Sequence, residues 1–159
     1  MSYLKREKFM MCAIRKARQG IRRGQTPFGA CIVKGGKIIS SAHNGVWQGA
    51  DSTAHAEMRA IKKACSKLKT IDLSGCVIYS TCEPCPMCFS ACHWSKISCI
   101  IYGSKIYAAK KLGFNELCVS NEKMKKIGKS KIRVMGGVLR DENIALFKMW
   151  LKQPGKRTY

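Results

Sequence analysis

The chain has 159 residues and a formal net charge of +21, and 46% of its residues are apolar. This length is ordinary for one domain with its own core, so we expect a single domain over residues 1–159. The composition, with no long apolar run, excludes a membrane protein and a disordered chain. The N-terminus shows no secretory signal, and the ten cysteines therefore favour a reducing, cytoplasmic location over a disulfide framework.

The large positive charge is compatible with nucleic acid, anionic metabolites or acidic surfaces as partners. Lysine outnumbers arginine by more than two to one, and the densest basic segment, residues 123–133, contains no aromatic residue. Clusters that bind phosphate groups favour arginine. We interpret the segment as a solvated basic face rather than as a nucleic-acid site.

Apolar periodicity and turn residues predict helices alternating with strands. In chain order we expect a helix at about 5–19, strands at 28–33 and 37–43 around a Gly35-Gly36 turn, a helix at about 53–67, a strand at 76–80, a helix carrying Cys85, Cys88 and Cys92, strands at 97–103 and 131–139, and a helix at 141–152. Ser52 or Thr53 is the expected N-cap of the second helix, and Pro84 is expected in the first turn of the third. This order predicts an α/β fold with a mixed sheet between helices.

Four cysteines lie close together in the stretch TCEPCPMCFSACHW, at positions 82, 85, 88 and 92. Their spacing is also that of iron-sulfur cluster ligands in bacterial ferredoxins. The stretch TAHAE adds His55 and Glu57 at the predicted start of a helix. A His-x-Glu motif followed by Pro-Cys-x-x-Cys is the signature of zinc-dependent deaminases, so the combination predicts a zinc site.

The residue types at these positions suit catalytic zinc. His55, Cys85 and Cys88 supply three nitrogen and sulfur ligands, and a catalytic site keeps its fourth position for water. Bound zinc lowers the pKa of that water from about 15.7 toward about 7. Glu57 is two residues from His55, about 200° around a helix, so the two can share a site only at the first turn. There Glu57 would act as the proton shuttle.

Two other metal sites compete with this interpretation. An iron-sulfur cluster would need Cys82 and Cys92 as ligands, would leave His55 and Glu57 unexplained, and lacks the proline that follows the fourth cysteine in ferredoxins. A structural zinc site would need a fourth protein ligand, for which Cys82 or Cys92 is available. Otherwise both cysteines are small core residues.

With these motifs the sequence resembles the cytidine deaminase-like superfamily, from the first helix to about residue 150. The resemblance implies a three-layer α/β/α fold with a mixed five-stranded sheet, one Zn²⁺ per subunit where two helix N-termini meet, and a homodimer or larger assembly. Within the superfamily the sequence is similar to the bacterial guanine deaminases, in the stretches TPFGACIV, DSTAHAE and STCEPCPMC, in Trp94, in GF at 113–114 and in Tyr159. This similarity implies hydrolysis of guanine to xanthine and ammonia, with water attack at C2 and protonation of N3 by Glu57.

The same similarity implies a set of substrate contacts. Phe28 would stack on the purine and Asn44 would hydrogen-bond it, with Ala56 beside them in the pocket. Glu116 lies where guanine deaminases carry an aspartate, and its neighbour Asn115 is the alternative contact. Trp94 would form a pocket wall, and Tyr159 would reach the partner's site by exchange of residues 140–159 between subunits. The alternatives are core positions for Phe28 and Trp94 and a frayed end for Tyr159.

The nearest rival in the superfamily is the tRNA adenosine deaminase group, which shares TAHAE and EPC-x-MC. Those enzymes typically carry an apolar residue in place of Cys82, valine in place of Phe28 and no tryptophan at Trp94. Deamination of guanosine or of another base or nucleoside is a further alternative. A non-catalytic zinc or nucleic-acid-binding module would bind zinc and release no ammonia.

Overall fold

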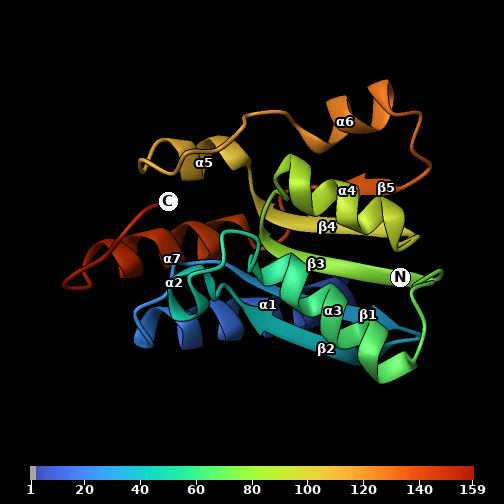
Figure 1. Cartoon of the computed structure of the whole chain (residues 1–159), viewed down its shortest axis with the longest axis horizontal. Coiled ribbons are helices and arrows are strands. Elements are labelled where there is room, and N and C mark those ends of the chain that lie inside the picture. Colours follow the sequence, from blue (N-terminus) through green and yellow to red (C-terminus); the bar gives the residue numbers. More distant parts are fainter. Residues whose placement is uncertain (1–2) are drawn as a thin grey trace.

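The protein folds into a five-stranded sheet covered by helices on both faces, as a computed structural model of residues 3–159 shows (Figure 1). The strands are β1 (Gly29–Lys34), β2 (Lys37–His43), β3 (Cys76–Cys82), β4 (Cys99–Ser104) and β5 (Arg133–Met135). The helices are α1 (Tyr3–Arg22), α2 (Val46–Gly49), α3 (Ala56–Leu68), α4 (Pro86–Trp94), α5 (Ile106–Lys110), α6 (Asn121–Ile127) and α7 (Arg140–Leu151). No helix among the described residues combines the length and apolar character needed to cross a membrane.

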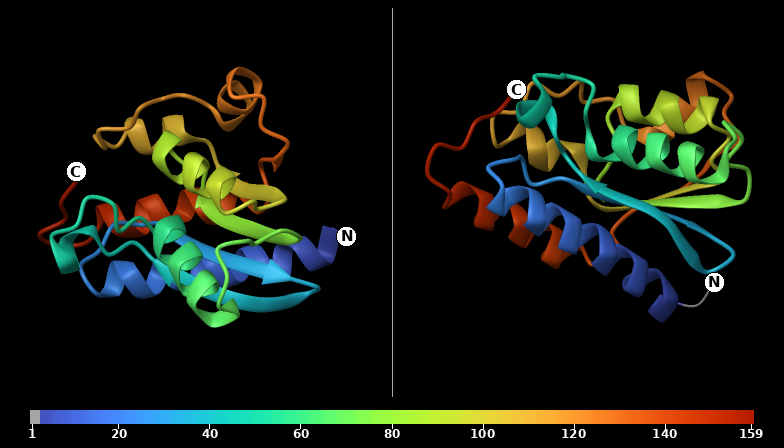
Figure 2. Two further views of the ribbon diagram at one scale, coloured as in Figure 1. Left: turned by 45° about the vertical axis from the view of Figure 1, so that its right-hand side comes forward. Right: turned by 60° about the horizontal axis from the view of Figure 1, so that its bottom comes forward.

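The sheet is mixed, with the strand order β2-β1-β3-β4-β5. Strand β1 is antiparallel to both β2 and β3, whereas β3, β4 and β5 run parallel. Helices α1 and α7 cover one face of the sheet, and α3 and α4 cover the other (Figure 2). The three-layer α/β/α fold with a mixed five-stranded sheet is thereby confirmed.

The core lies on both faces of the three central strands. Strands β1, β3 and β4 are almost wholly buried and consist largely of Ile, Val, Cys and Ala, the composition of strands covered on both faces. Helix α1 packs on the sheet through a buried apolar stripe at helical spacing, made of Phe9, Met10, Ala13, Ile14, Ala17 and Ile21. This rigid layer fixes where the strands end, and therefore where the loops and helix starts around the sheet's edge lie.

The β1-β2 hairpin follows the predicted turn. Gly35 and Gly36 have φ angles of +55° and +77°, the left-handed values that a two-residue hairpin turn requires. At the opposite, open end of the hairpin the backbone N–H of Asn44 donates to the carbonyl of Phe28 at 3.0 Å. The hairpin thus sets two of the predicted substrate contacts side by side.

Two helix starts differ from the prediction. Helix α3 begins at Ala56 with His55 as its N-cap, not Ser52 or Thr53, because the Asp51 side chain accepts hydrogen bonds from the backbone and hydroxyl of Thr53 and holds these residues in a turn. Helix α4 has Pro86, not Pro84, at its first position, where a missing N–H costs nothing. Both corrections move a predicted zinc ligand, His55 or Cys85, to the N-cap itself.

The last strand is shorter than the predicted 131–139, since β5 covers only residues 133–135. Gly137 has a φ of +86°, which breaks the extended run, and a side chain on Gly136 would collide with the ring of Tyr102. The short helices α2, α5 and α6 were not predicted. Their sequences are too short for a clear apolar period, and α6 is marked mainly by the Ser120 hydroxyl that accepts from the backbone N–H of Lys123.

Candidate active site

The site forms where the N-termini of α3 and α4 meet at the end of β3. His55 and Cys85 are the N-cap residues of the two helices, and Cys88 lies in the first turn of α4. Neither N-cap side chain forms a capping hydrogen bond, so both side chains are free to face the site. The positive ends of two helix dipoles therefore converge on the place where two thiolates would lie.

The distances among these three residues fit a zinc ion. The Nδ1 atom of His55 lies 3.6 Å from the Sγ atoms of Cys85 and Cys88. Tetrahedral zinc, with Zn–S near 2.3 Å and Zn–N near 2.1 Å, would hold N and S about 3.6 Å apart. The residues present thus fit the cofactor, and the protein is a zinc-binding one.

Among residues 3–159, these three form the one group of His, Cys, Asp and Glu side chains whose ligand atoms could hold a metal, all within 4.8 Å of one another. Cys82 and Cys92 do not belong to it, although both are buried. The geometry therefore favours neither the four-cysteine cluster nor a closed structural zinc site. Three protein ligands leave the fourth position that hydrolysis needs.

The ligand thiols are electrostatically unequal. A hydrogen bond from the Cys88 thiol lowers the pKa of Cys85 to about 4, and the nearby His55 adds to this effect against the opposing effect of burial. The pKa of Cys88 is raised, since its thiol donates to Cys85 and is buried. Burial alone would lower the pKa of His55, but the hydrogen bond with Cys85 and the charge of Glu57 outweigh it and raise that pKa. The surroundings of Cys85 therefore favour its thiolate form.

Glu57 is buried beside the metal-ligating residues, in the first turn of α3. The Ser80 hydroxyl on β3 donates to its Oε1 at 2.6 Å, and the Cys88 thiol lies 3.6 Å from its Oε2. Burial raises the pKa of Glu57, while His55 and Ser80 oppose that rise. Such a carboxylate is fixed in position and can accept and return a proton, as a general acid-base residue must.

A small cavity opens above the metal-ligating residues. It is lined by Phe28, Asn44, His55, Glu57, Cys82, Glu83, Cys85, Glu116 and Tyr159, and its free volume is about 10 Å³. Four of the predicted substrate contacts, Phe28, Asn44, Glu116 and Tyr159, are therefore brought together. Two do not line it: Ala56 is fully buried in the first turn of α3, and Trp94 is 80% exposed at the C-terminal end of α4.

The C-terminal tail folds back into the chain's own site, running from α7 past α2 toward α5 (Figure 1). The Asn44 side chain donates to the Tyr159 hydroxyl at 2.8 Å, and the Tyr159 ring lies 5.2 Å from that of His55. The guanidinium of Arg157 stacks 4.1 Å above the ring of Trp47. In this structure Tyr159 is an ordered part of the site and not a frayed end, and burial raises its pKa.

Glu116 faces the cavity, whereas its neighbour Asn115 is exposed and donates its backbone N–H to the Tyr159 carbonyl. Burial, together with the charge of Cys85 and against the attraction of His55, raises the pKa of Glu116 to about 7. Of the two neighbours, Glu116, which lies where guanine deaminases carry an aspartate, is therefore the one that lines the cavity.

Sequence reasoning missed three residues of this site. Cys82 lines the cavity and does not serve only the core. Ser80 orients Glu57, and Glu83 accepts hydrogen bonds from the backbone N–H groups of Ile106 and Asn121. Those two groups flank the segment that carries Glu116, so Glu83 anchors that segment beside the zinc-ligating loop. The available signal was the run of polar residues at the C-terminal end of the buried strand β3.

The chain matches the cytidine and deoxycytidylate deaminase zinc-binding region over residues 4–104, which include every proposed zinc ligand. It belongs to this family. The protein is accordingly a deaminase, a hydrolase that acts on a C–N bond of a cyclic amidine.

Relatives of two kinds are similar to this deaminase. It is 35% identical to guanine deaminase of Bacillus subtilis (strain 168) over 154 residues, 96% of this chain and 98% of the relative. It is 48% identical to a tRNA-specific adenosine deaminase of Aquifex aeolicus (strain VF5) over 99 residues, 62% of this chain and 66% of the relative. A solved structure of guanine deaminase from Nitrosomonas europaea superposes with a TM-score of 0.84 at 30% identity, covering 91% of this chain and 83% of that one.

Proposed function

We propose that this deaminase hydrolyses a free purine base, guanine, to xanthine and ammonia. The observation that carries the proposal is the cavity itself, in which an aromatic ring, an amide and a carboxylate face the zinc-ligating residues and Glu57. A flat base with several donors and acceptors suits such a combination of one apolar face and a few convergent polar groups. The resemblance over nearly the whole chain to a guanine deaminase supports the same substrate.

In the proposed mechanism, His55, Cys85 and Cys88 hold zinc, which when bound supplies the Lewis acidity that lowers the pKa of water. Glu57 takes a proton from the water whose oxygen adds to C2 of guanine, and delivers that proton to N3. A second proton passes through Glu57 to the amino group on C2. The C2–N bond then breaks, ammonia leaves, and the C2 carbonyl of xanthine forms. Ser80 holds the carboxylate in position throughout.

Recognition of the base is assigned to the remaining lining residues. The ring of Phe28 is fixed by edge contacts with Phe114 and Phe147, 5.1 and 6.0 Å between ring centres, so it offers a rigid stacking surface. The Asn44 amide oxygen accepts from the backbone N–H of Val46, which orients its NH₂ group toward the cavity. The Glu116 carboxylate would accept from the donor edge of guanine.

Substrate entry requires Tyr159 to move, because a free volume of about 10 Å³ holds about one water molecule and not a purine. The phenol now occupies the hydrogen bond from Asn44 that the base would take. We propose that the tail withdraws from its own site and that the segment 140–159 exchanges between the subunits of a homodimer. We also propose a cytoplasmic location, which the ten free cysteines favour because disulfides are rare in reducing compartments.

The decisive measurement is ammonia release from guanine by the zinc-loaded protein, with adenine, cytosine, guanosine and a tRNA anticodon stem-loop assayed alongside. We expect release from guanine, and Glu57→Gln should retain zinc and abolish turnover. Inosine formed in the stem-loop, with no release from guanine, would instead establish the tRNA adenosine deaminase alternative. That alternative is supported by the 48% identity of the shorter match.

A further inference from the structure

Trp94 ends α4 with an indole that is 80% exposed, which is unusual for so large an apolar ring. The residue lines a hollow of about 170 Å³, together with Phe89 and Met124 on its apolar side and His93 and Ser130 on its polar side. An α-helix rises about 1.5 Å per residue, so Trp94 lies about 13 Å from Cys85 along the axis of α4. The hollow is thus separate from the catalytic cavity within one chain.

A basic groove of about 590 Å³ continues from this hollow. The two depressions share His93 and Ser130, whose side chains are 3.0 Å apart. Four cationic side chains line the groove, Lys96, Lys129, Lys131 and Arg133, all of them exposed, and no Asp or Glu does. We call the hollow and the groove together the Trp94 groove.

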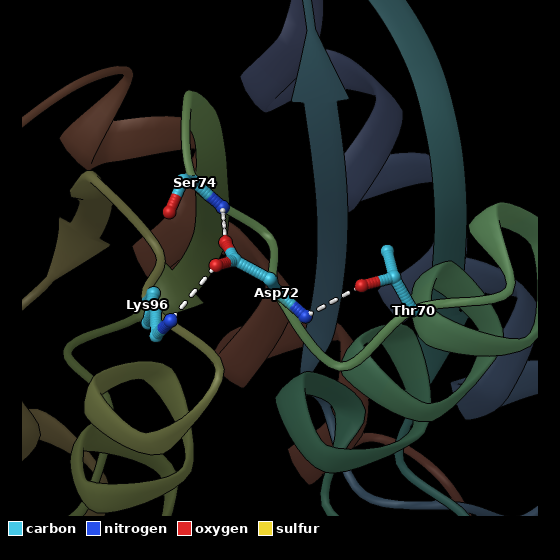
Figure 3. Close-up of polar contacts among 4 residues, drawn as sticks. All are labelled: Thr70, Asp72, Ser74 and Lys96. Atoms are coloured by element: carbon cyan, nitrogen blue, oxygen red, sulfur yellow. Dashed lines mark hydrogen bonds and ion pairs between the residues drawn. The ribbon is translucent and has the colours of Figure 1, made fainter.

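Only one of these four cations has an acidic partner within the described part of the chain. The ammonium of Lys96 lies 2.9 Å from Oδ2 of Asp72, and Oδ1 of the same carboxylate accepts from the backbone N–H of Ser74 (Figure 3). No ion pair is found there for Lys129, Lys131 or Arg133. Three uncompensated charges therefore line a groove that leads to an exposed aromatic ring.

We propose that the Trp94 groove binds single-stranded nucleic acid, with one base stacked on Trp94 and the neighbouring phosphates on Lys129, Lys131 and Arg133. An aromatic stacking surface beside a cationic track is what such strands require, and the track needs no base-specific contact. The sequence of residues 123–133 contained no aromatic residue, and the fold supplies one from α4. The groove is lined by four cationic side chains and by no Asp or Glu, which favours a polyanionic strand as the occupant.

The test is fluorescence anisotropy of labelled 12-nucleotide oligo(U) and oligo(dT) with zinc-loaded protein, between 50 and 200 mM salt. Three phosphate contacts predict that log affinity falls against log salt with a slope of about −2. The double variant Lys129→Ala with Lys131→Ala loses two of these contacts, so its slope should be smaller in magnitude by about 1.4. Trp94→Ala should weaken binding roughly tenfold, whereas Trp94→Phe, which keeps a stacking ring, should retain most of the affinity. Unchanged thermal unfolding monitored by circular dichroism establishes that each variant is folded.

The matched control is Lys62→Ala with Lys67→Ala, which removes the same charge from exposed positions on α3. An equal loss in this control would mean that net charge alone attracts the strand, and would overturn the proposal. Full affinity of Trp94→Ala for the oligonucleotides would also overturn the proposal. So would sedimentation that shows a stable dimer which Trp94→Ala dissociates and the lysine variants do not. The assay measures binding and needs no turnover. Its result therefore tests the Trp94 groove even if the protein does not deaminate guanine.

Discussion

The hydrogen bond between Ser80 and Glu57 should control the rate of deamination, and Ser80→Ala tests this. The two oxygens are 2.6 Å apart and both side chains are buried, so no solvent replaces a lost hydroxyl. A hydrogen bond to a charged group contributes about 1.5–3 kcal/mol. Each 1.4 kcal/mol lost from transition-state stabilisation lowers the rate about tenfold. We therefore expect kcat/KM for guanine to fall about 10- to 100-fold while zinc content stays at one per chain.

Ser104→Ala is the matched control for this variant. Ser104 is as buried as Ser80, but its hydroxyl donates to the carbonyl of Thr81 at 3.1 Å and does not touch Glu57. Ammonia release and metal analysis on both variants separate the two roles. If Ser80→Ala retained wild-type kcat/KM, or if Ser104→Ala lost as much activity, Ser80 would be a structural residue and not a positioning one.

Three more predictions concern the segments around the cavity. Glu83→Gln leaves one acceptor for two backbone donors, so the segment 106–121 should loosen and the KM for guanine should rise several-fold with zinc content unchanged. In the folded, zinc-free protein, burial raises the pKa of Glu116 from its ordinary value of 4.5 to about 7. Between these two pH values the folded state binds more protons than the unfolded state, so the free energy of unfolding falls as pH rises through that window. Glu116→Gln should therefore unfold at a higher temperature than wild type at pH 8 and at the same temperature at pH 4. Tyr159→Phe removes the hydrogen bond that holds the tail to Asn44, and the KM for guanine should fall about 2- to 10-fold in steady-state assays; an increase would mean that the hydroxyl contacts bound substrate.

Local patterns were enough to predict the zinc-binding half of the site. His55, Cys85 and Cys88 are specified by short-range spacing, because each occupies a helix start whose geometry depends on a few neighbouring residues. The Gly35-Gly36 turn similarly fixed the register of the hairpin. The exact helix starts were mispredicted by two or three residues, since Asp51 holds Thr53 in a turn before α3 and Pro86 takes the first position of α4.

Long-range contacts account for what the sequence did not predict. Ser80 meets Glu57 only because β3 lies beside the start of α3, and nothing in the stretch CVIYST marks its serine as functional. Trp94 and the lysines of residues 129–131 become neighbours only when α4 and α6 pack together. Tyr159 reaches Asn44 across 115 positions of sequence. No periodicity or spacing rule encodes such approaches.

The division of the site along the chain also explains why resemblance fixes the reaction more firmly than the substrate. The family match ends at residue 104 and contains the proposed zinc ligands, Glu57 and Ser80, to which we assign the hydrolysis. Glu116 and Tyr159, which complete the cavity, lie in the segment that follows. High identity within the shared region therefore reports the chemistry and only part of the cavity, Phe28 and Asn44, whereas alignment with residues 105–159 adds Glu116 and Tyr159 to the comparison. The choice between guanine and a tRNA adenosine therefore depends on what the residues of the cavity bind, and the ammonia-release assay decides it.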